Sequence, residues 1–186
     1  MCGRRGCYRE ITAYWRYAIE LFPVFDKRRI PVARFLCGKM ASTFSLLPVQ
    51  LIPYHQYTAG AVLGALVLGL GCWQAGEKGF YGAALAVDPD SLLAPYLIAC
   101  WLAMVLRGLR RAHGALSGLY DLSAVGRARR AHPSWLEFNG YLHALGWKPE
   151  VRWGPWVMGL LGGYTRKHRQ FLFGTPSQHR IRIRPG

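Results

Sequence analysis

The sequence predicts an α+β protein in which a small N-terminal β unit packs on a mainly α-helical region. Residues 1–56 are rich in strand formers and prolines, whereas apolar runs of Ala, Leu and Gly dominate from residue 57. At 52% hydrophobic residues, the chain is too apolar to be disordered. We expect a β unit over 1–56, a helical unit with a basic linker over 57–133, and a C-terminal helix with a basic tail over 134–186.

The β unit is expected to contain three extended segments. Residues 14–19 alternate and are rich in strand formers, and residues 28–40 form a basic segment in which Pro31 favours an edge or a bulge. This segment reaches Cys37 at a Gly-Lys turn, and residues 43–48 lead away from it. Two strands that meet at a cysteine-bearing turn form one half of a zinc ribbon, so we expect the unit to be zinc-ribbon-like.

A metal site at this turn would lack a ligand. A zinc knuckle reads Cys-x-x-Cys, and Met40 stands where the second cysteine would be. A neutral thioether does not satisfy Zn²⁺ as a thiolate does. The remaining candidate ligands are Cys2, Cys7 and Cys37, with His55 as a weaker fourth. We expect zinc to be lost, because three of four ligands rarely retain a structural metal ion.

Helix signals begin at Thr58, which can cap a helix that continues to Trp73. Gly60, Gly64 and Gly69 in this helix would let a second long helix approach closely.

A short element over 77–86 precedes that second helix. Asp88 can cap the second helix, which is expected to continue through Pro95 to about His113. Three arginines near residue 110 would then lie at its negative C-terminal end.

Three further segments follow the second long helix. Residues 114–133 are expected to be a linker of Gly, Ala and Arg. Ser134 and Glu137 form a capping-box pattern at the start of a helix that reaches residue 145. The segment 151–163 is apolar and aromatic, and its type stays open.

Two further motifs follow the cysteine turn: Thr-Phe-Ser-Leu-Leu-Pro at 43–48 and Pro-Tyr-His-Gln-Tyr at 53–57. In these motifs the chain resembles a family of bacterial transposase-associated proteins. The resemblance covers residues 14–57, and a weaker match continues as far as residue 109. It implies an N-terminal zinc ribbon, a degenerate helix-turn-helix and a role in DNA binding. It also implies an earlier Cys-x-x-Cys upstream of Cys7, so we expect a truncated or decayed copy.

The net charge of +15 is unevenly distributed. The first 40 residues carry nine Lys and Arg against three acids, residues 41–106 carry one against three, and residues 107–186 carry fourteen against three. Basic ends around a nearly neutral apolar middle indicate an anionic partner, either nucleic acid or an anionic membrane surface.

Double-stranded DNA is the expected partner, bound mainly through phosphate contacts. A helix-turn-helix over 58–113 would read bases with its third helix, yet that helix has no charged side chain between residues 91 and 106. Phosphate contacts require only positive charge near the duplex. The candidate DNA contacts are Arg28, Arg29, Arg34, Lys39, Arg107, Arg110, Arg111, Arg127, Arg129, Arg130, Arg180, Arg182 and Arg184.

No catalytic residues are expected. The acidic residues do not lie on an alternating apolar strand of the kind that carries a metal-binding carboxylate triad. His113, at the expected helix end, is better explained as a partner of the helix dipole. Five cysteines without a framework spacing favour reduced thiols. The sequence therefore predicts a non-enzymatic, cytoplasmic protein without a small-molecule substrate.

A small basic membrane protein is the alternative from another class. No side chain from Met40 to Gly76 is charged, and residues 57–76 are long enough to span a bilayer. Residues 91–109 could form a second span, with the basic flanks inside. The Gly and Ala content of the first run and Pro95 in the second argue against this two-helix hairpin, so DNA binding is the preferred prediction.

Overall fold

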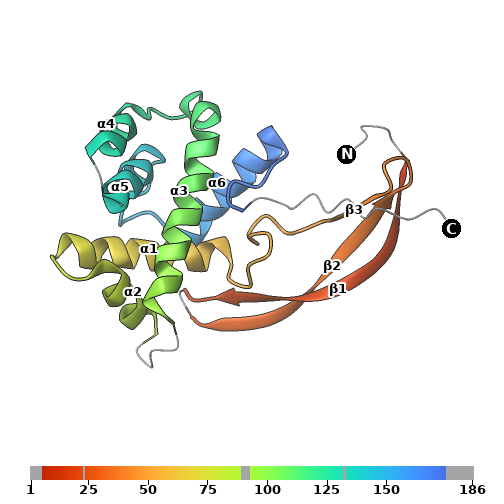
Figure 1. Ribbon diagram of the computed structural model, residues 1–186, viewed down its shortest axis with the longest axis horizontal. Helices are drawn as coiled ribbons and strands as arrows, with labels where there is room; N and C mark the ends of the chain where they lie inside the picture. Colours follow the sequence, from red (N-terminus) through yellow and green to blue (C-terminus); the bar gives the residue numbers. More distant parts are fainter. Residues whose placement is uncertain (1–5, 23, 89–92, 132, 175–186) are drawn as a thin grey trace.

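The computed structural model describes residues 6–22, 24–88, 93–131 and 133–174, apart from the side chains of 128–131. These residues form a three-stranded antiparallel sheet and six helices (Figure 1). The sheet is a long, curved hairpin that extends from one side of a helical body. The expected α+β class is therefore confirmed.

The hairpin consists of β1 Tyr8–Glu20 and β2 Asp26–Cys37. A short third strand, β3 Ser42–Ser45, pairs with the far end of β2, so the order is β1-β2-β3. Both long strands extend well beyond the segments that local propensity indicates, because each strand supplies the hydrogen-bonding partners of the other along its length.

Two local features shape the pairing within the hairpin. The register shifts between Glu10 and Thr12, which leaves Ile11 as an extra residue in β1. β3 pairs only with residues 34–37 of β2. Pro31 therefore lies where β2 has a neighbouring strand on one side only, as expected for a residue that lacks an N–H.

The hairpin is attached to the helical body at Thr58. Thr58 N donates to Ile19 O at 3.0 Å, and Ile19 N donates to Gln56 O at 2.9 Å. The Thr58 hydroxyl accepts from Ala61 N at 3.0 Å, so the predicted cap of the first helix is confirmed. The same hydroxyl donates to Glu20 Oε2 at 2.7 Å. One side chain thus joins the end of β1 to the first turn of the helix.

Six helices follow the sheet in the described part of the chain. They are α1 Ala59–Gln74, α2 Gly79–Val87, α3 Pro95–Ser117, α4 Ser123–Ala131, α5 Ser134–Ala144 and α6 Trp153–His168. α3 runs through the middle of the body, in contact with α1, α2 and α5 (Figure 1). Its residues Ile98, Trp101 and Val105 are fully buried in a core to which every helix contributes. Each such side chain stabilises the fold by roughly 1.5–3 kcal/mol.

The predicted start of α3 is wrong. The helix begins at Pro95, not after Asp88. Asp88 is the C-cap of α2, and its N–H donates to Ala84 O at 2.9 Å. Proline suits the first position of a helix, where an N–H would have no helical partner, and it forces Ala94 into extended backbone with ψ 136°. Pro95, which was expected inside the helix, therefore sets its boundary.

The predicted linker over 114–133 is also wrong. α3 continues to Ser117, and α4 begins at Ser123, whose N–H donates to Asp121 Oδ1 at 2.9 Å. Val125 of this short helix is fully buried and belongs to the hydrophobic core. Because α3 is longer than expected, its three arginines lie in mid-helix, and the helix-dipole explanation of their position fails.

The glycines of α1 lie against residues other than those of the long helix that the sequence predicts as their neighbour. A Cβ added at Gly64 would lie 2.5 Å from the ring of Phe22, which follows β1. A Cβ added at Gly69 would lie 2.8 Å from Trp135 of α5 and 2.9 Å from Ala83 of α2. The closest approaches to α1 at these two positions therefore come from Phe22, α5 and α2, not from α3.

Among the residues that the structure describes, none of the helices combines the length and the apolar character needed to cross a membrane. α1 has 16 residues, and the 23 residues of α3 include Arg107, Arg110 and Arg111.

Candidate nucleic-acid interface

Aromatic and basic side chains share one face of the hairpin. Successive strand residues point to opposite faces, so the register places Trp15 and Tyr17 of β1 on the same face as Lys27 and Arg29 of β2. Tyr17 lies directly opposite Arg29 in the pairing. The face therefore carries two rings on β1 and two cations on β2, with Pro31 opposite Trp15 and Ile19 opposite Lys27.

The cations contact the rings. Arg29 Cζ lies 5.5 Å from the centroid of the Trp15 ring, and Lys27 Nζ lies 4.8 Å from that of Tyr17. Trp15 is nevertheless 61% exposed and Tyr17 40% exposed. A cation–π contact at an exposed site contributes only about 0.5–1 kcal/mol. Internal packing alone therefore gives no reason for placing these large rings at the surface.

The same face continues to the far end of the sheet. β2 is regular from Lys27 to Phe35, so Phe35 shares the face of Lys27 and Arg29. Its ring stacks on Phe44 of β3 with centroids 5.5 Å apart, and Tyr8 meets Phe44 edge-on at 5.6 Å. We call this set the aromatic–basic face. Its aromatic and basic members are Tyr8, Trp15, Tyr17, Lys27, Arg29, Phe35 and Phe44.

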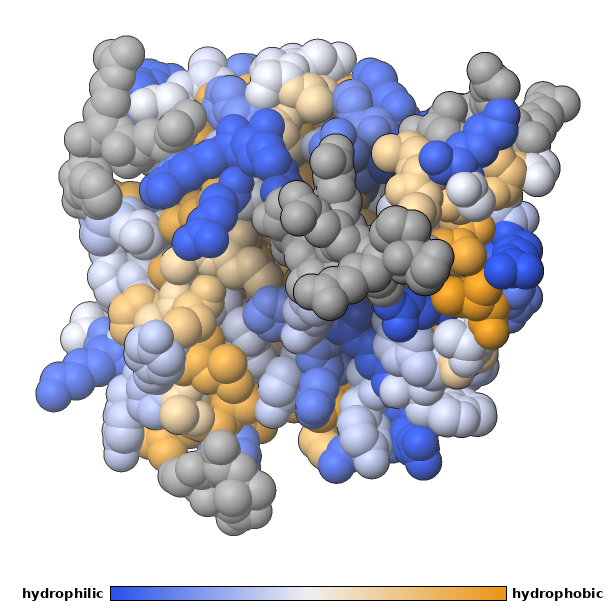
Figure 2. Space-filling view, turned by 45° about the vertical axis from the view of Figure 1, so that its right-hand side comes forward, coloured by the Kyte–Doolittle hydropathy of each residue, from blue (hydrophilic) through white to orange (hydrophobic). Residues whose placement is uncertain are grey.

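The opposite face of the hairpin is turned toward the rest of the protein. Val32 is fully buried there, and Arg16 donates to the main-chain carbonyls of Ile52 and His55. Burial lowers the pKa of the Arg16 guanidinium from its ordinary value. The aromatic–basic face is left toward solvent. Figure 2 shows hydrophobic side chains at the surface beside strongly hydrophilic ones in this view of the molecule.

The charge of the aromatic–basic face is positive. By register, Glu10 is the only acidic residue of β1, β2 and β3 on this face, and it lies beyond the bulge. Glu20 and Asp26 belong to the opposite face. The central part of the aromatic–basic face therefore presents two cations without an opposing carboxylate.

The hairpin residues predicted to contact DNA divide between the two faces. Arg29 belongs to the aromatic–basic face, whereas Arg28 and Arg34 lie on the opposite one. Arg28 pairs with Asp26 at 3.3 Å, and Arg34 donates to Thr43 Oγ1 at 3.0 Å. Lys39 is exposed in the turn after β2.

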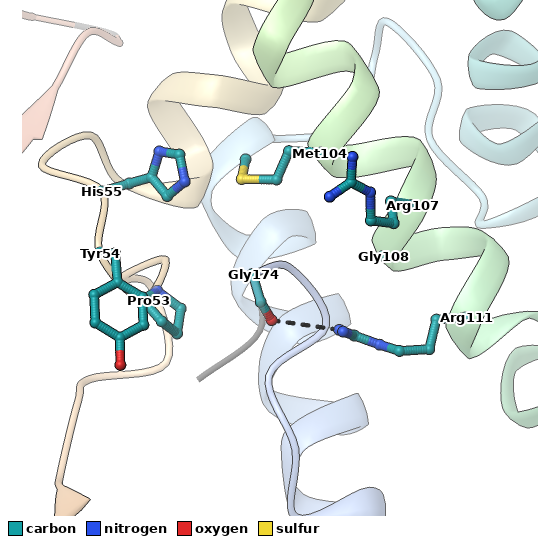
Figure 3. Close-up of a pocket in the computed structure, with 8 residues that line it drawn as sticks. All are labelled: Pro53, Tyr54, His55, Met104, Arg107, Gly108, Arg111 and Gly174. Carbon is teal, nitrogen blue, oxygen red and sulfur yellow. Dashed lines mark hydrogen bonds between the residues drawn. The ribbon is translucent and has the colours of Figure 1, made fainter. Parts of the chain in front are cut away.

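Arg107 and Arg111 meet the 53–55 loop at a pocket of about 190 Å³. His55 and Arg107 point toward one another across it, and Arg111 extends toward Gly174 (Figure 3). The Arg111 guanidinium donates to the carbonyl of Gly174 at 3.4 Å and to those of residues 171 and 172 at 3.2 Å. Arg111 thereby holds the segment after α6 against α3, while Arg107 is exposed at the pocket.

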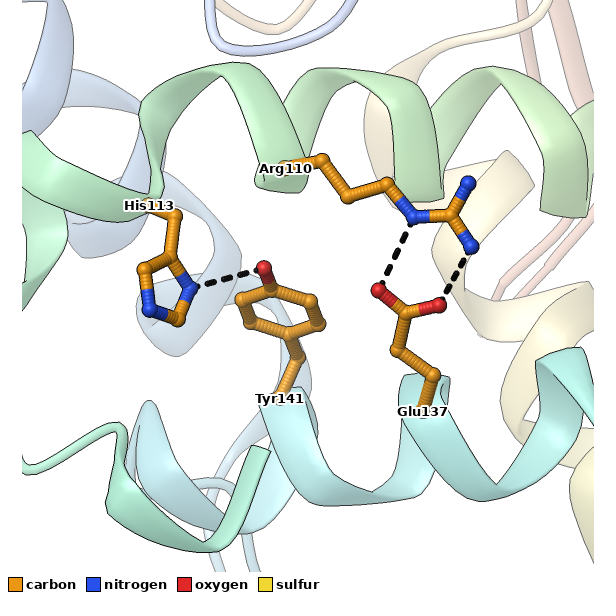
Figure 4. Close-up of polar contacts among 4 residues, drawn as sticks. All are labelled: Arg110, His113, Glu137 and Tyr141. Carbon is orange, nitrogen blue, oxygen red and sulfur yellow. Dashed lines mark hydrogen bonds and ion pairs between the residues drawn. The ribbon is translucent and has the colours of Figure 1, made fainter. Parts of the chain in front are cut away.

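Arg110 makes an internal ion pair. Its guanidinium donates two hydrogen bonds to Glu137 of α5, one of 2.9 Å from Nε and one of 2.5 Å from Nη2 (Figure 4). These bonds raise the pKa of Arg110. The Glu137 side chain is only 4% exposed, so the pair neutralises a buried carboxylate. The predicted capping box is wrong, because the N-cap of α5 is Pro133, which makes no side-chain cap hydrogen bond and has no N–H for Glu137 to accept from.

His113 lies one turn further along α3 and contacts Tyr141 of α5. His113 Nδ1 and the Tyr141 hydroxyl are 3.0 Å apart (Figure 4). Tyr141 is fully buried. His113 is therefore part of the α3–α5 contact and does not lie at a helix end.

The other predicted DNA contacts lie in α4 and in the tail. Arg127 is exposed on α4. Arg129 and Arg130 belong to the same helix, and their side chains lie outside the described part. Arg180, Arg182 and Arg184 also lie outside the described residues.

Two of the candidate zinc ligands lie close together. Cys7 Sγ and Cys37 Sγ are 3.6 Å apart where β1 begins and β2 ends, and Cys2 lies outside the described residues. Met40 is 48% exposed in the following turn. His55 belongs to the loop that Arg16 binds, and Arg16 is eight strand residues, or about 26 Å, from the start of β1. Within the described ranges no three His, Cys, Asp or Glu residues are grouped to hold a metal ion. These residues alone do not fit a tetrahedral zinc site.

The aromatic members of the interface were not among the predicted site residues. Rings stand at 14, 15 and 17 and cations at 27, 28 and 29, so strand alternation alone does not tell which of them share a face. Only the register of the hairpin brings the rings at 15 and 17 together with the cations at 27 and 29.

No family model, curated protein or solved structure matches this chain.

Proposed function

We propose that the protein binds DNA without catalysing a reaction on it, and that the aromatic–basic face is its principal contact surface. The observation that carries the proposal is the pairing of two exposed rings with two cations on the solvent side of the hairpin. Contacts between cations and phosphates dominate the affinity of proteins for DNA. A face that combines charge with exposed rings suits a polyanion that also has planar bases.

The charge of the rest of the chain supports the same partner. A net charge of +15 attracts a polyanion over long range. Exposed cations such as Arg107 and Lys39 can add phosphate contacts. Arg110 and Arg111 form internal hydrogen bonds, so we propose that they contribute to the electrostatic field and do not contact DNA directly.

The resemblance of residues 14–57 to transposase-associated proteins favours DNA as the partner of this protein. We propose that double-stranded DNA is among its targets. We propose that the three-stranded sheet is a zinc-ribbon-like unit that has lost its metal and uses its strands as the binding surface. The closely spaced Cys7 and Cys37 and the methionine at position 40 support this interpretation.

The experiment is a titration of a fluorescently labelled DNA duplex with the full chain at several salt concentrations. Each lost phosphate contact flattens the dependence of log K on log salt by about 0.9 for duplex DNA. The Lys27→Gln/Arg29→Gln variant is expected to lose about two such contacts, so its slope should be flatter by about 1.8.

The matched control removes two charges elsewhere. Lys148→Gln/Arg152→Gln changes two exposed cations before and at the N-cap of α6. Its slope should stay close to that of the wild type. The proposal is overturned if the wild type does not bind, if binding is independent of salt, or if both double variants lose affinity equally.

A further inference from the structure

We infer that the aromatic–basic face binds single-stranded DNA more tightly than duplex DNA, with unpaired bases stacked on its exposed rings. This inference rests on the proposed function and specifies the form of DNA that the face prefers. It follows from the surroundings of Trp15, from the second aromatic group along the sheet, and from the charge of the face.

The surroundings of Trp15 leave room for a base. Arg29 lies over the Trp15 ring from the direction of Tyr17. Pro31 lies directly opposite Trp15, and on the side away from Arg29 the next pair of residues on this face is Ala13 opposite Ala33, which presents only two methyl groups. A planar base can therefore lie against the ring above this alanine pair, where no large side chain of the sheet competes with it.

A second aromatic group lies on the far side of the alanine pair. Phe35 is two residues beyond Ala33 in β2, and its ring is already stacked on Phe44. The face from Lys27 to Phe35 covers eight strand steps, or about 26 Å. Other sheet-based binders of single strands cover on the order of 4–16 nucleotides and combine a basic groove with stacking rings.

Duplex DNA cannot use these rings in the same way. Its bases are stacked inside the helix, so it offers phosphates and groove edges to a flat sheet face. Stacking on an aromatic side chain requires an unpaired base, and every base has a suitable ring face. Because neither Asn nor Gln occurs on the aromatic–basic face, we expect little discrimination between base sequences.

The charge of the face argues for an anionic occupant over a second copy of the chain. Two copies packed face to face would bring together two net-positive surfaces, because each face offers only Glu10 against Lys27 and Arg29. Phosphates neutralise these cations while the bases cover the rings.

The test compares three ligands of equal length at one salt concentration: a single-stranded dT 15-mer, a 15-base-pair duplex and an abasic 15-mer with the same phosphates. The wild type should bind dT most tightly. Trp15→Ala should weaken binding of dT by about 10- to 100-fold, the effect of losing one stacked base, and should leave binding of the duplex and of the abasic strand nearly unchanged. Trp15→Phe should restore most of the affinity for dT.

Tyr96→Ala is the matched control, because Tyr96 is an aromatic residue on α3 that is 79% exposed and lies off the sheet. It should change no affinity. If wild-type protein binds dT and duplex equally, or if Trp15→Ala weakens all three ligands alike, the single-strand inference is overturned while DNA binding stands. If none of the three ligands binds, the proposed function itself fails.

Discussion

Thr58 Oγ1 donates a hydrogen bond of 2.7 Å to Glu20 Oε2 and accepts one of 3.0 Å from Ala61 N. The side chain of Thr58 is therefore at once the cap of α1 and a link to the last residue of β1. The orientation of the hairpin, and with it the aromatic–basic face, depends on this junction between sheet and helices.

Replacing this threonine should weaken the fold. Thr58→Ala removes both hydrogen bonds, and we expect the free energy of unfolding to fall by about 1–2 kcal/mol. Thr58→Ser keeps the hydroxyl and should lose much less. Urea unfolding followed by circular dichroism measures both variants. An alanine variant as stable as the serine variant would mean that the junction does not depend on this hydroxyl.

Two glycines in α1 should respond in opposite directions to the same substitution. A methyl group at Gly64 would meet the Phe22 ring, whereas one at Gly71 meets no atom within 4 Å. We expect Gly64→Ala to destabilise the protein by about 1–3 kcal/mol through overpacking. Gly71→Ala should stabilise it by up to about 1 kcal/mol, because alanine favours the helix. Equal stability changes in the two variants, measured by urea unfolding, would contradict the described packing of Phe22.

Stability should depend on pH through His55. Burial and the positive charge of Arg16 lower the pKa of its imidazole below the ordinary value of 6.5. The unfolded chain therefore binds more protons in mildly acidic solution, and the free energy of unfolding falls as the pH drops through about 6.5. His55→Gln should show a smaller loss between pH 7.5 and pH 5.5 than the wild type, measured as the shift of the urea midpoint.

His143 provides the comparison, since it is exposed on α5. His143→Gln therefore controls for the effect of replacing a histidine by glutamine outside the contact with Arg16. If both variants reduce the pH dependence equally, His55 is not the group responsible.

The purified chain should hold less than one zinc ion per molecule. Cys7 and Cys37 can supply two thiolates. Met40 stands where a Cys-x-x-Cys knuckle has its second cysteine, and it offers only a thioether. Elemental analysis after purification without chelators measures the content, and Met40→Cys should raise it. One zinc per wild-type chain that survives a chelator would show that other residues complete the site.

The helix starts show what local sequence can and cannot predict. Thr58 was identified correctly as a cap because its hydrogen bond is local to the first turn of α1. Asp88-Pro89 and Ala94-Pro95 are competing signals for the start of α3, and the structure uses the second. Short-range patterns did not decide between them.

The proposed interface depends on contacts that are remote in the sequence. Trp15 and Arg29 come together through the pairing of β1 with β2, and an extra residue at Ile11 shifts which residues of β1 share a face. Arg110 similarly meets a carboxylate 27 residues away. Composition therefore predicts an anionic partner, whereas the residues that we propose to face it could be chosen only from the fold.

Photo-crosslinking to DNA that contains 5-bromouracil, followed by digestion and mass spectrometry, tests most directly whether the hairpin is the DNA-binding surface. Excitation of the halogenated base forms bonds to side chains in contact with it. The account predicts crosslinked peptides from β1 and β2, with Trp15 and Tyr17 as modified residues. Crosslinks confined to peptides of α1–α6 would contradict it.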